Sequence, residues 1–191
     1  MKNKTRVKQL TVSAVMIALS TVLSLVTIFK MPLGGSVTIF NMLPVCMISI
    51  MYGCGWGALC AAVYSAMQLV LGVGDISGSG LSPVAFAGSI VLDYLLAFIV
   101  LGLAGAFRKK GVWGCVAGIT LAVCLRMVCH VLSGVLIFAI WAPDGWQPLP
   151  YSLAYNGLYM APELVLTVLG AVFLLKEPHA ARLFRLESPA E

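Results

Sequence analysis

The sequence predicts an all-α membrane protein, a bundle of six transmembrane helices. Its mean hydropathy is +1.02, and 61% of the 191 residues are hydrophobic while only 10% are charged. The apolar residues form long runs without strand-like alternation, and only helices or closed barrels satisfy the backbone in lipid. We expect residues 1–191 to form a single integral membrane domain with helices at about 10–29, 38–52, 56–72, 84–107, 112–139 and 151–175.

The first predicted helix follows a basic N-terminal segment and extends to Phe29. Its apolar run is too long for a signal peptide and no small-x-small cleavage motif follows it, so we interpret it as a membrane span. The helices at 38–52 and 56–72 are separated by Gly53–Gly55, which indicates a tight helical hairpin.

The last three predicted helices are separated by loops of distinct composition. A glycine-rich loop at 72–83 precedes the fourth helix, and the basic triplet Arg108–Lys110 follows it. An aromatic-rich loop separates the fifth helix from the sixth. The glycine-rich loop lacks the Gly-Lys-Ser/Thr ending of a phosphate-binding loop, and no such motif occurs elsewhere in the sequence. We therefore do not expect this chain to hydrolyse ATP by that route.

Catalytic motifs are also missing from the sequence. It contains no HExxH, no GxSxG and no paired Cys/His arrangement, so we expect neither an enzyme nor a metal site or cofactor.

The placement of the basic residues predicts the orientation of the bundle. Six spans put both termini on one side, and Lys and Arg are enriched on the cytoplasmic side of membranes. We therefore expect cytoplasmic termini. Because the basic residues gather on that side of the membrane, the net charge of +5 does not indicate binding to nucleic acid. The predicted cytoplasmic residues are Lys2, Lys4, Arg6, Lys8, Arg108, Lys109, Lys110, Lys176, Arg182 and Arg185, whereas Lys30, Asp75 and Asp144 lie opposite.

A few ionisable residues lie inside predicted spans, where polar groups are costly and usually functional. With a helical rise of about 1.5 Å per residue, Asp93 and His130 each lie about 13 Å below the outer ends of their helices. Asn156 lies about 8 Å deep, and Tyr151 begins the last helix at the outer surface. We expect these four residues to line one cavity in the outer half of the bundle.

Two further charged residues, Arg126 and Glu163, lie deeper, at about 18–20 Å. We expect them to form a structural ion pair beneath the cavity, because a lone charge there is costly; a proton relay is the alternative. Asp93 would then be the uncompensated charge, and an anionic pocket with aromatic walls suits an organic cation. An equally open interpretation makes Asp93 a hydrogen-bonding residue between helices.

Two small-residue motifs suggest close contacts. The pair Gly34 and Gly35 permits close approach of the backbone to a ligand or to another helix. Ala14 and Ala18 are four residues apart on the first helix, a spacing that lets another helix come close. The same spacing recurs on other predicted helices, so this motif alone is a weak signal.

Several segments, taken together in order and spacing, resemble the thiamine-binding S components (the ThiT family) of energy-coupling-factor vitamin transporters. The similarity covers nearly the whole chain. The segments are PLGGSVT (Pro32–Thr38), LDYLLAF (Leu92–Phe98), HVLSGV (His130–Val135), APDG (Ala142–Gly145) and YSLAYNGLYMAPE (Tyr151–Glu163).

This resemblance implies an S-component fold and a multi-pass protein of a prokaryotic plasma membrane that captures thiamine from outside. It also implies docking through Ala14 and Ala18 onto a transmembrane coupling subunit (EcfT type), together with two cytoplasmic ATPase subunits. Asp93 matches the acidic residue that hydrogen-bonds the aminopyrimidine, and Phe138 matches an aromatic stacking position. The other matched site residues are Tyr94, His130, Gly134, Tyr151 and Asn156.

Other functions stay open at this point. An S component for another vitamin or for a pyrimidine precursor would share most of these features. A structural membrane protein with a satisfied polar core would share the buried charges but would bind no ligand.

Overall fold

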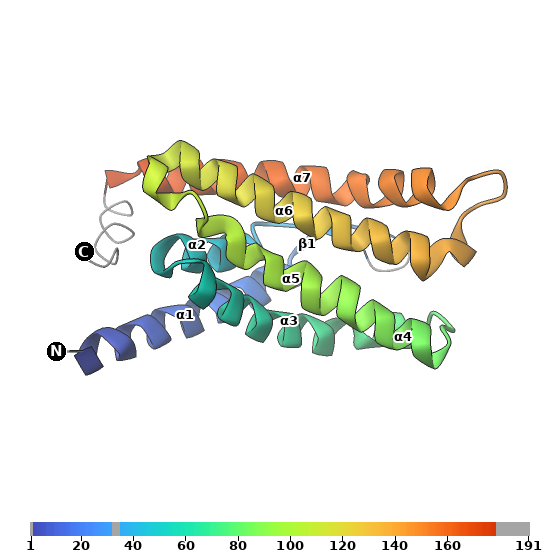
Figure 1. Ribbon diagram of the computed structural model, residues 1–191, viewed down its shortest axis with the longest axis horizontal. Coiled ribbons are helices and arrows are strands. Elements are labelled where there is room, and N and C mark those ends of the chain that lie inside the picture. Colours follow the sequence, from blue (N-terminus) through green and yellow to red (C-terminus); the bar gives the residue numbers. More distant parts are fainter. Residues whose placement is uncertain (1, 32–34, 179–191) are drawn as a thin grey trace.

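The protein folds into a bundle of six helices, as predicted. The computed structural model describes residues 2–31 and 35–178. In the described part, five helices are long and apolar enough to cross a membrane. The sixth, α2 (Leu43–Tyr52), is shorter. The first residues of α1 (Lys2–Leu25) and the last residues of α7 (Pro148–Lys176) lie at the same end of the bundle (Figure 1).

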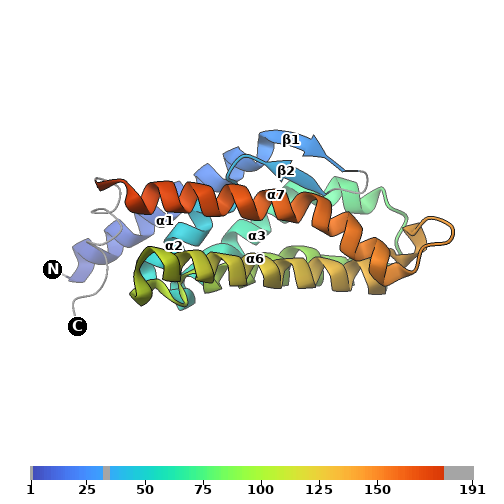
Figure 2. The same cartoon turned by 90° about the horizontal axis from the view of Figure 1, so that it is seen from above.

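A short β-hairpin interrupts the region that the sequence predicted as the end of one helix and the start of the next. Strand β1 (Thr27–Lys30) pairs antiparallel with β2 (Ser36–Thr38), and Thr27 faces Thr38. The helix predicted to reach Phe29 therefore ends at Leu25. The hairpin lies beside α7 (Figure 2). These strands are rich in β-branched residues, which favour extended backbone but prolong an apolar run as well as a helix does.

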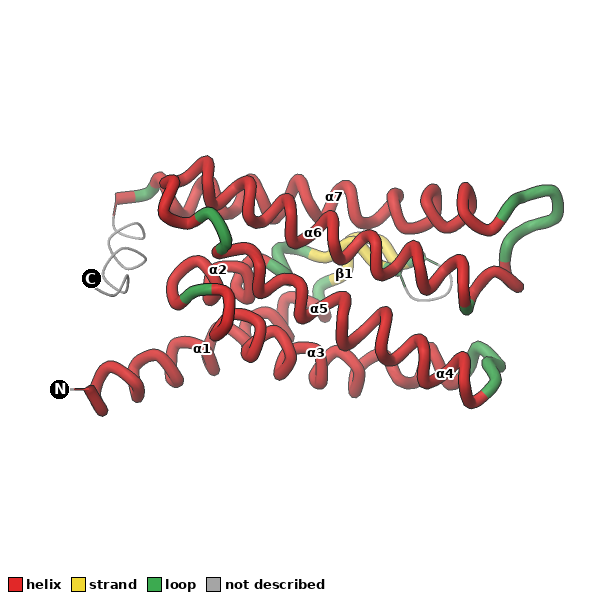
Figure 3. Tube along the Cα trace, viewed as in Figure 1, coloured by secondary structure: helices red, strands yellow, loops and turns green. Residues whose placement is uncertain are grey.

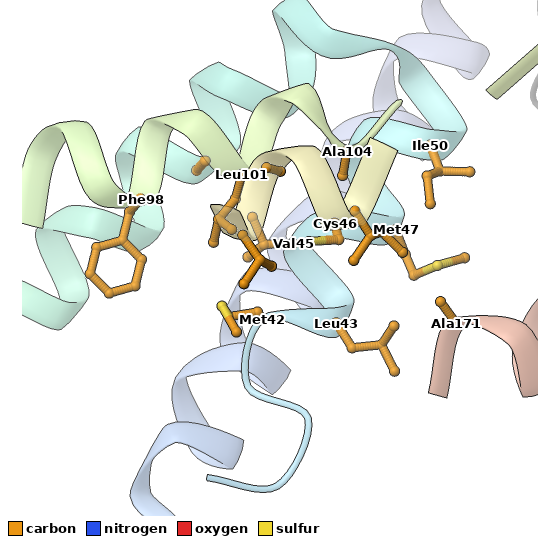
Figure 4. Packing of buried hydrophobic residues seen from close by; sticks show 14 of the residues in the cluster. Met42, Leu43, Val45, Cys46, Met47, Ile50, Phe98, Leu101, Ala104 and Ala171 are labelled. Atoms are coloured by element: carbon orange, nitrogen blue, oxygen red, sulfur yellow. The ribbon is translucent and has the colours of Figure 1, made fainter. Parts of the chain in front are cut away.

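Helix α2 is the centre of the core. The turn that leads into it contains Phe40 with a φ of 58°, a conformation rare for non-glycine residues. At 10 residues, α2 is about 15 Å long, half of what a bilayer requires. Its side chains pack against those of Phe98, Leu101 and Ala104 (Figure 4). Because the core is concentrated around α2, the other half of the bundle has room for a cavity.

The hairpin predicted between the second and third helices is present. Gly53, between α2 and α3 (Cys54–Ser77), has a φ of 93°, which glycine adopts without steric cost. Ser49 then ties α2 to the fourth helical segment: its hydroxyl donates to the Gly102 carbonyl and accepts from the Gly105 amide at 2.9 Å.

The fourth predicted helix is continuous in direction but irregular in its turns. It comprises α4 (Pro83–Ser89), the π-helical segment η2 (Ile90–Leu96), α5 (Ala97–Ile99) and the 3-10 segment η3 (Val100–Gly105). Single π-helical turns inside helices are common at functional sites. Asp93 and Tyr94 both lie in η2.

The last two long helices pack against each other along their length (Figures 1 and 3). A short 3-10 turn, η4 (Arg108–Lys110), leads into α6 (Gly111–Leu136), and η5 (Phe138–Trp141) follows it. Helix α7 contains Pro162 without ending there.

Candidate ligand-binding site

A cavity of about 390 Å³ lies between the β-hairpin, α3, η2, α6 and α7. Its size is in the range of pockets that enclose a small organic molecule. The site residues predicted from the sequence converge on it from separate segments of the chain. The described ones that line it are Gly35, Asp93, Tyr94, His130, Gly134, Phe138, Tyr151 and Asn156. Gly34 falls outside the described residues.

Asp93 and His130 are in direct contact. The Nδ1 atom of His130 lies 2.9 Å from Oδ1 of Asp93, and the Ser133 hydroxyl donates to Oδ2 of the same carboxylate. On the other side of the ring, Nε of Arg126 donates to Nε2 of His130 at 3.2 Å. Because Nε2 accepts a hydrogen bond, the proton of a neutral imidazole belongs on Nδ1, where it is donated to Asp93. The imidazole therefore connects a carboxylate to a guanidinium.

Asp93 is therefore hydrogen-bonded to His130 and Ser133, but a neutral imidazole and a hydroxyl leave its negative charge in place. The expected ion pair between Arg126 and Glu163 is not formed among the described residues. Oε1 of Glu163 accepts instead from the amide and the hydroxyl of Thr38, at 2.6 and 2.7 Å. Arg126 turns to His130 and stacks its guanidinium over the Phe98 ring at 4.0 Å. The β-hairpin, which the sequence analysis missed, supplies the competing partner for Glu163.

Helix α7 presents an aromatic wall. Tyr151, Tyr155 and Tyr159 are spaced four residues apart, so they share a helix face. The centroids of adjacent tyrosine rings lie 6.0 and 6.2 Å apart. Tyr159 also packs edge-on against His130 at 6.1 Å. The sequence analysis did not select Tyr159 or Ser133, although the four-residue spacing from Tyr155 pointed to the first.

Asn156 is fixed by its neighbours on α7. Its side-chain nitrogen donates to the Ser152 carbonyl at 2.9 Å, and its oxygen accepts from the Tyr159 hydroxyl at 2.6 Å. The Ser152 hydroxyl in turn donates to the Val131 carbonyl of α6 at 3.1 Å. These bonds hold the polar face of α7 in one orientation toward the cavity.

Two glycines permit close approach around the cavity. A Cβ on Gly35 would lie 2.7 Å from the ring of Tyr159, and a Cβ on Gly134 would overlap the Ser152 hydroxyl. Gly134 therefore lets α6 and α7 come together at the cavity wall.

One side of the cavity is bounded by an ion pair exposed to solvent. Nζ of Lys30, on β1, lies 3.3 Å from Oδ2 of Asp75, on α3. Together with Tyr94 and Phe138, these residues surround the space with aromatic rings and charges. Such a lining suits an organic cation, because aromatic faces attract positive charge. No group of three potential metal ligands occurs among residues 2–31 and 35–178.

The two alanines predicted to dock a partner lie on the exposed face of α1. Ala14 and Ala18 are both exposed, whereas Ser13 and Ser20 on the opposite face are buried. The Ser13 hydroxyl accepts a hydrogen bond from the Trp56 indole at 2.9 Å, which orients α1 against α3.

Two known proteins with similar sequences are both thiamine transporters. The chain is 30% identical over 167 residues to the thiamine transporter ThiT of Bacillus subtilis (strain 168), covering 80% of this chain and 82% of that protein. It is 28% identical over 149 residues to the thiamine transporter ThiT of Lacticaseibacillus paracasei, covering 71% of each.

A solved structure has the same fold. The structure of ThiT from Listeria monocytogenes matches with a TM-score of 0.75 at 20% identity, covering 94% of this chain and 98% of that one. The family model described as thiamine transporter protein (Thia_YuaJ) matches residues 10–183. The chain therefore belongs to the thiamine transporter protein (Thia_YuaJ) family.

Proposed function

We propose that this protein is the thiamine-binding S component of an energy-coupling-factor importer, and that it captures thiamine in the cavity between η2, α6 and α7. Membership of a thiamine transporter family and five helices able to cross a bilayer make it a multi-pass cell-membrane protein with a role in thiamine transport. One observation supports thiamine binding in this cavity most directly. Residues from five separate segments of the chain line the cavity, and the chain belongs to a thiamine transporter family.

The charges around the cavity support a cationic ligand. Asp75, Asp93 and Glu163 contribute three carboxylates to the lining, whereas Lys30 and Arg126 contribute two cations. Thiamine combines a permanently positive thiazolium ring with an aminopyrimidine that donates and accepts hydrogen bonds. The tyrosines of α7 and Phe138 offer ring faces for the cation, and Asp93 offers a carboxylate for the aminopyrimidine.

The energy for uptake would come from other subunits. The sequence has no phosphate-binding loop, and the relatives are named as transporters, so we expect partner ATPases to supply the work. We propose that a transmembrane coupling subunit (EcfT type) docks on the face of α1 that exposes Ala14 and Ala18. Cytoplasmic termini, as the basic residues predict, would place both ends of the chain near these ATPases.

The proposal is tested by titrating the detergent-purified chain, without partners, with thiamine, its phosphates and riboflavin. Trp146 packs edge-on against Tyr151, which lines the cavity, so tryptophan fluorescence is a suitable signal. Saturable quenching by thiamine and none by riboflavin is the expected result. Binding of another vitamin in place of thiamine would change the substrate and keep the class. No change in tryptophan fluorescence with any ligand, in a protein shown to be folded, would indicate a structural membrane protein.

A further inference from the structure

Three buried polar atoms that have no hydrogen-bond partner in the described part of the chain line the same cavity. They are Oδ1 of Asn41, Nη1 of Arg126 and Oε2 of Glu163. The Asn41 side chain belongs to the turn between β2 and α2, and the other two belong to α6 and α7. Buried polar groups in proteins are nearly always paired, so three unpaired polar atoms at one cavity need an explanation. We call this group the floor cluster.

Two members of the floor cluster, Glu163 and Arg126, are held in place by their other contacts. Glu163 is 3% exposed, and its second oxygen accepts two bonds from Thr38. Arg126 is fixed by the bond of its Nε to His130 and by the ring of Phe98. Asn41 is 8% exposed and follows Phe40, whose left-handed backbone sets the direction of the turn. Glu163 and Arg126 thus each keep one polar atom that is not paired with any described residue.

The floor cluster offers one donor and two acceptors. Arg126 can give an N–H, whereas Glu163 and Asn41 can only receive a hydrogen bond at the atoms left unpaired. A neutral hydroxyl is complementary, because its oxygen accepts from the guanidinium while its hydrogen is donated to the carboxylate or the amide oxygen. A phosphate ester is not complementary, since its oxygens accept and would face the Glu163 carboxylate.

We propose that Asn41, Arg126 and Glu163 form a subsite for the hydroxyl group of the ligand and discriminate against its phosphate esters. This inference rests on the proposed function, because thiamine has a single hydroxyl, at the end of the ethyl arm on its thiazolium ring. The aminopyrimidine end would then lie toward Asp93 and His130, which already satisfy each other and form a separate polar group in the same cavity.

The test is a cycle that changes the ligand and the protein in turn. Thiamine, the analogue with an ethyl group in place of the hydroxyethyl arm, and thiamine monophosphate are titrated against the wild type, Glu163→Gln and Asn41→Ala. The wild type is expected to bind thiamine about tenfold more tightly than either analogue, the size of effect that one lost hydrogen bond to a charged group gives. Glutamine keeps an oxygen for Thr38 and turns an N–H toward the ligand, so Glu163→Gln should shrink the discrimination against the monophosphate.

A matched control removes a carboxylate that lies outside the cavity. Asp144→Asn lies in the exposed loop before α7, does not line the cavity, and should leave all ligand ratios unchanged. Equal wild-type affinity for thiamine and for its ethyl analogue would overturn the inference and leave the proposed function intact. Ligand ratios that stay the same in both floor variants would also overturn it, since the hydroxyl would then bind elsewhere.

Failure of the proposed function gives a different result, namely no binding of any of the three ligands by the folded wild type. The wild-type comparison needs no variant, so it decides whether the hydroxyl matters even if one substitution prevents folding. Asn41→Ala removes an acceptor that holds no other described group through its Oδ1. It therefore provides a second route if Glu163→Gln loosens the contact with Thr38.

Discussion

Asp93 and His130 form a contact of 2.9 Å that joins the π-helical segment η2 to α6. The imidazole also accepts from Arg126, so it lies between a negative and a positive group. The three residues act as one polar unit on the cavity wall rather than as a lone carboxylate. A change to any of them is expected to alter the other two.

Asp93→Asn is expected to weaken thiamine binding by about 1–3 kcal/mol, or roughly ten- to a hundredfold in Kd. The carboxylate accepts from both His130 and Ser133, and an asparagine would turn an N–H toward one of these donors. It would also remove the negative charge proposed to face the aminopyrimidine. The Kd is measured by fluorescence or calorimetric titration, with Asp144→Asn, in the exposed loop outside the cavity, as the control. Wild-type affinity in Asp93→Asn would remove Asp93 from the binding site.

Hydropathy was sufficient to predict the six helices but not the β-hairpin. Thr27 and Ile28 on β1, and Val37 and Thr38 on β2, are apolar or β-branched, so the apolar runs extend from the neighbouring helices into both strands. A window of hydropathy cannot distinguish this from helix. Missing the hairpin also led to the wrong partner for Glu163. Its carboxylate accepts hydrogen bonds from Thr38 instead of forming the ion pair that helical depth alone suggested.

Depth along the helices was a better guide to which residues meet. Asp93 and His130 were placed at equal depth from the helical rise, and their side chains touch in the structure. The rise could not give the rotation of each helix, which depends on local turns such as the π-helical segment η2. For the same reason, the serine that completes the Asp93 contact, Ser133, could not be selected among the other serines of the sequence.

Gly134→Ala is expected to destabilise the protein by about 1–3 kcal/mol and to weaken thiamine binding. The added methyl group would overlap the Ser152 hydroxyl, which lies next to Asn156 at the contact between α6 and α7. Thermal unfolding in detergent and ligand titration measure the two effects. Gly55→Ala is the matched control, because a Cβ there meets nothing within 4 Å. Equal melting temperatures for the two variants would show that α6 and α7 can move apart at Gly134 to accommodate the added methyl group without loss of stability.

Thr38→Val is expected to lower the melting temperature by several degrees, because it removes a hydroxyl that donates to the Glu163 carboxylate at 2.7 Å. Hydrogen bonds to charged groups contribute about 1.5–3 kcal/mol, and valine keeps the shape and the strand preference of threonine. Thr21→Val is the control, since that hydroxyl donates only to the carbonyl of Ile17 in its own helix. A Thr38→Val protein as stable as Thr21→Val would mean that the Thr38 hydroxyl adds no stability beyond the bond from the Thr38 amide to Glu163.

Tryptophan at Ala14 or Ala18 is expected to abolish thiamine uptake while leaving binding by the isolated chain unchanged. Both alanines lie on the exposed face of α1, away from the cavity, and the close approach of a second helix requires small side chains. Uptake is measured in cells that supply the coupling subunits, and binding is measured on the purified variants. Ala14→Ser and Ala18→Ser keep the side chains small and should transport normally. Full uptake by the tryptophan variants would move the docking surface to another part of the bundle, whereas loss of binding in both would point to misfolding of α1.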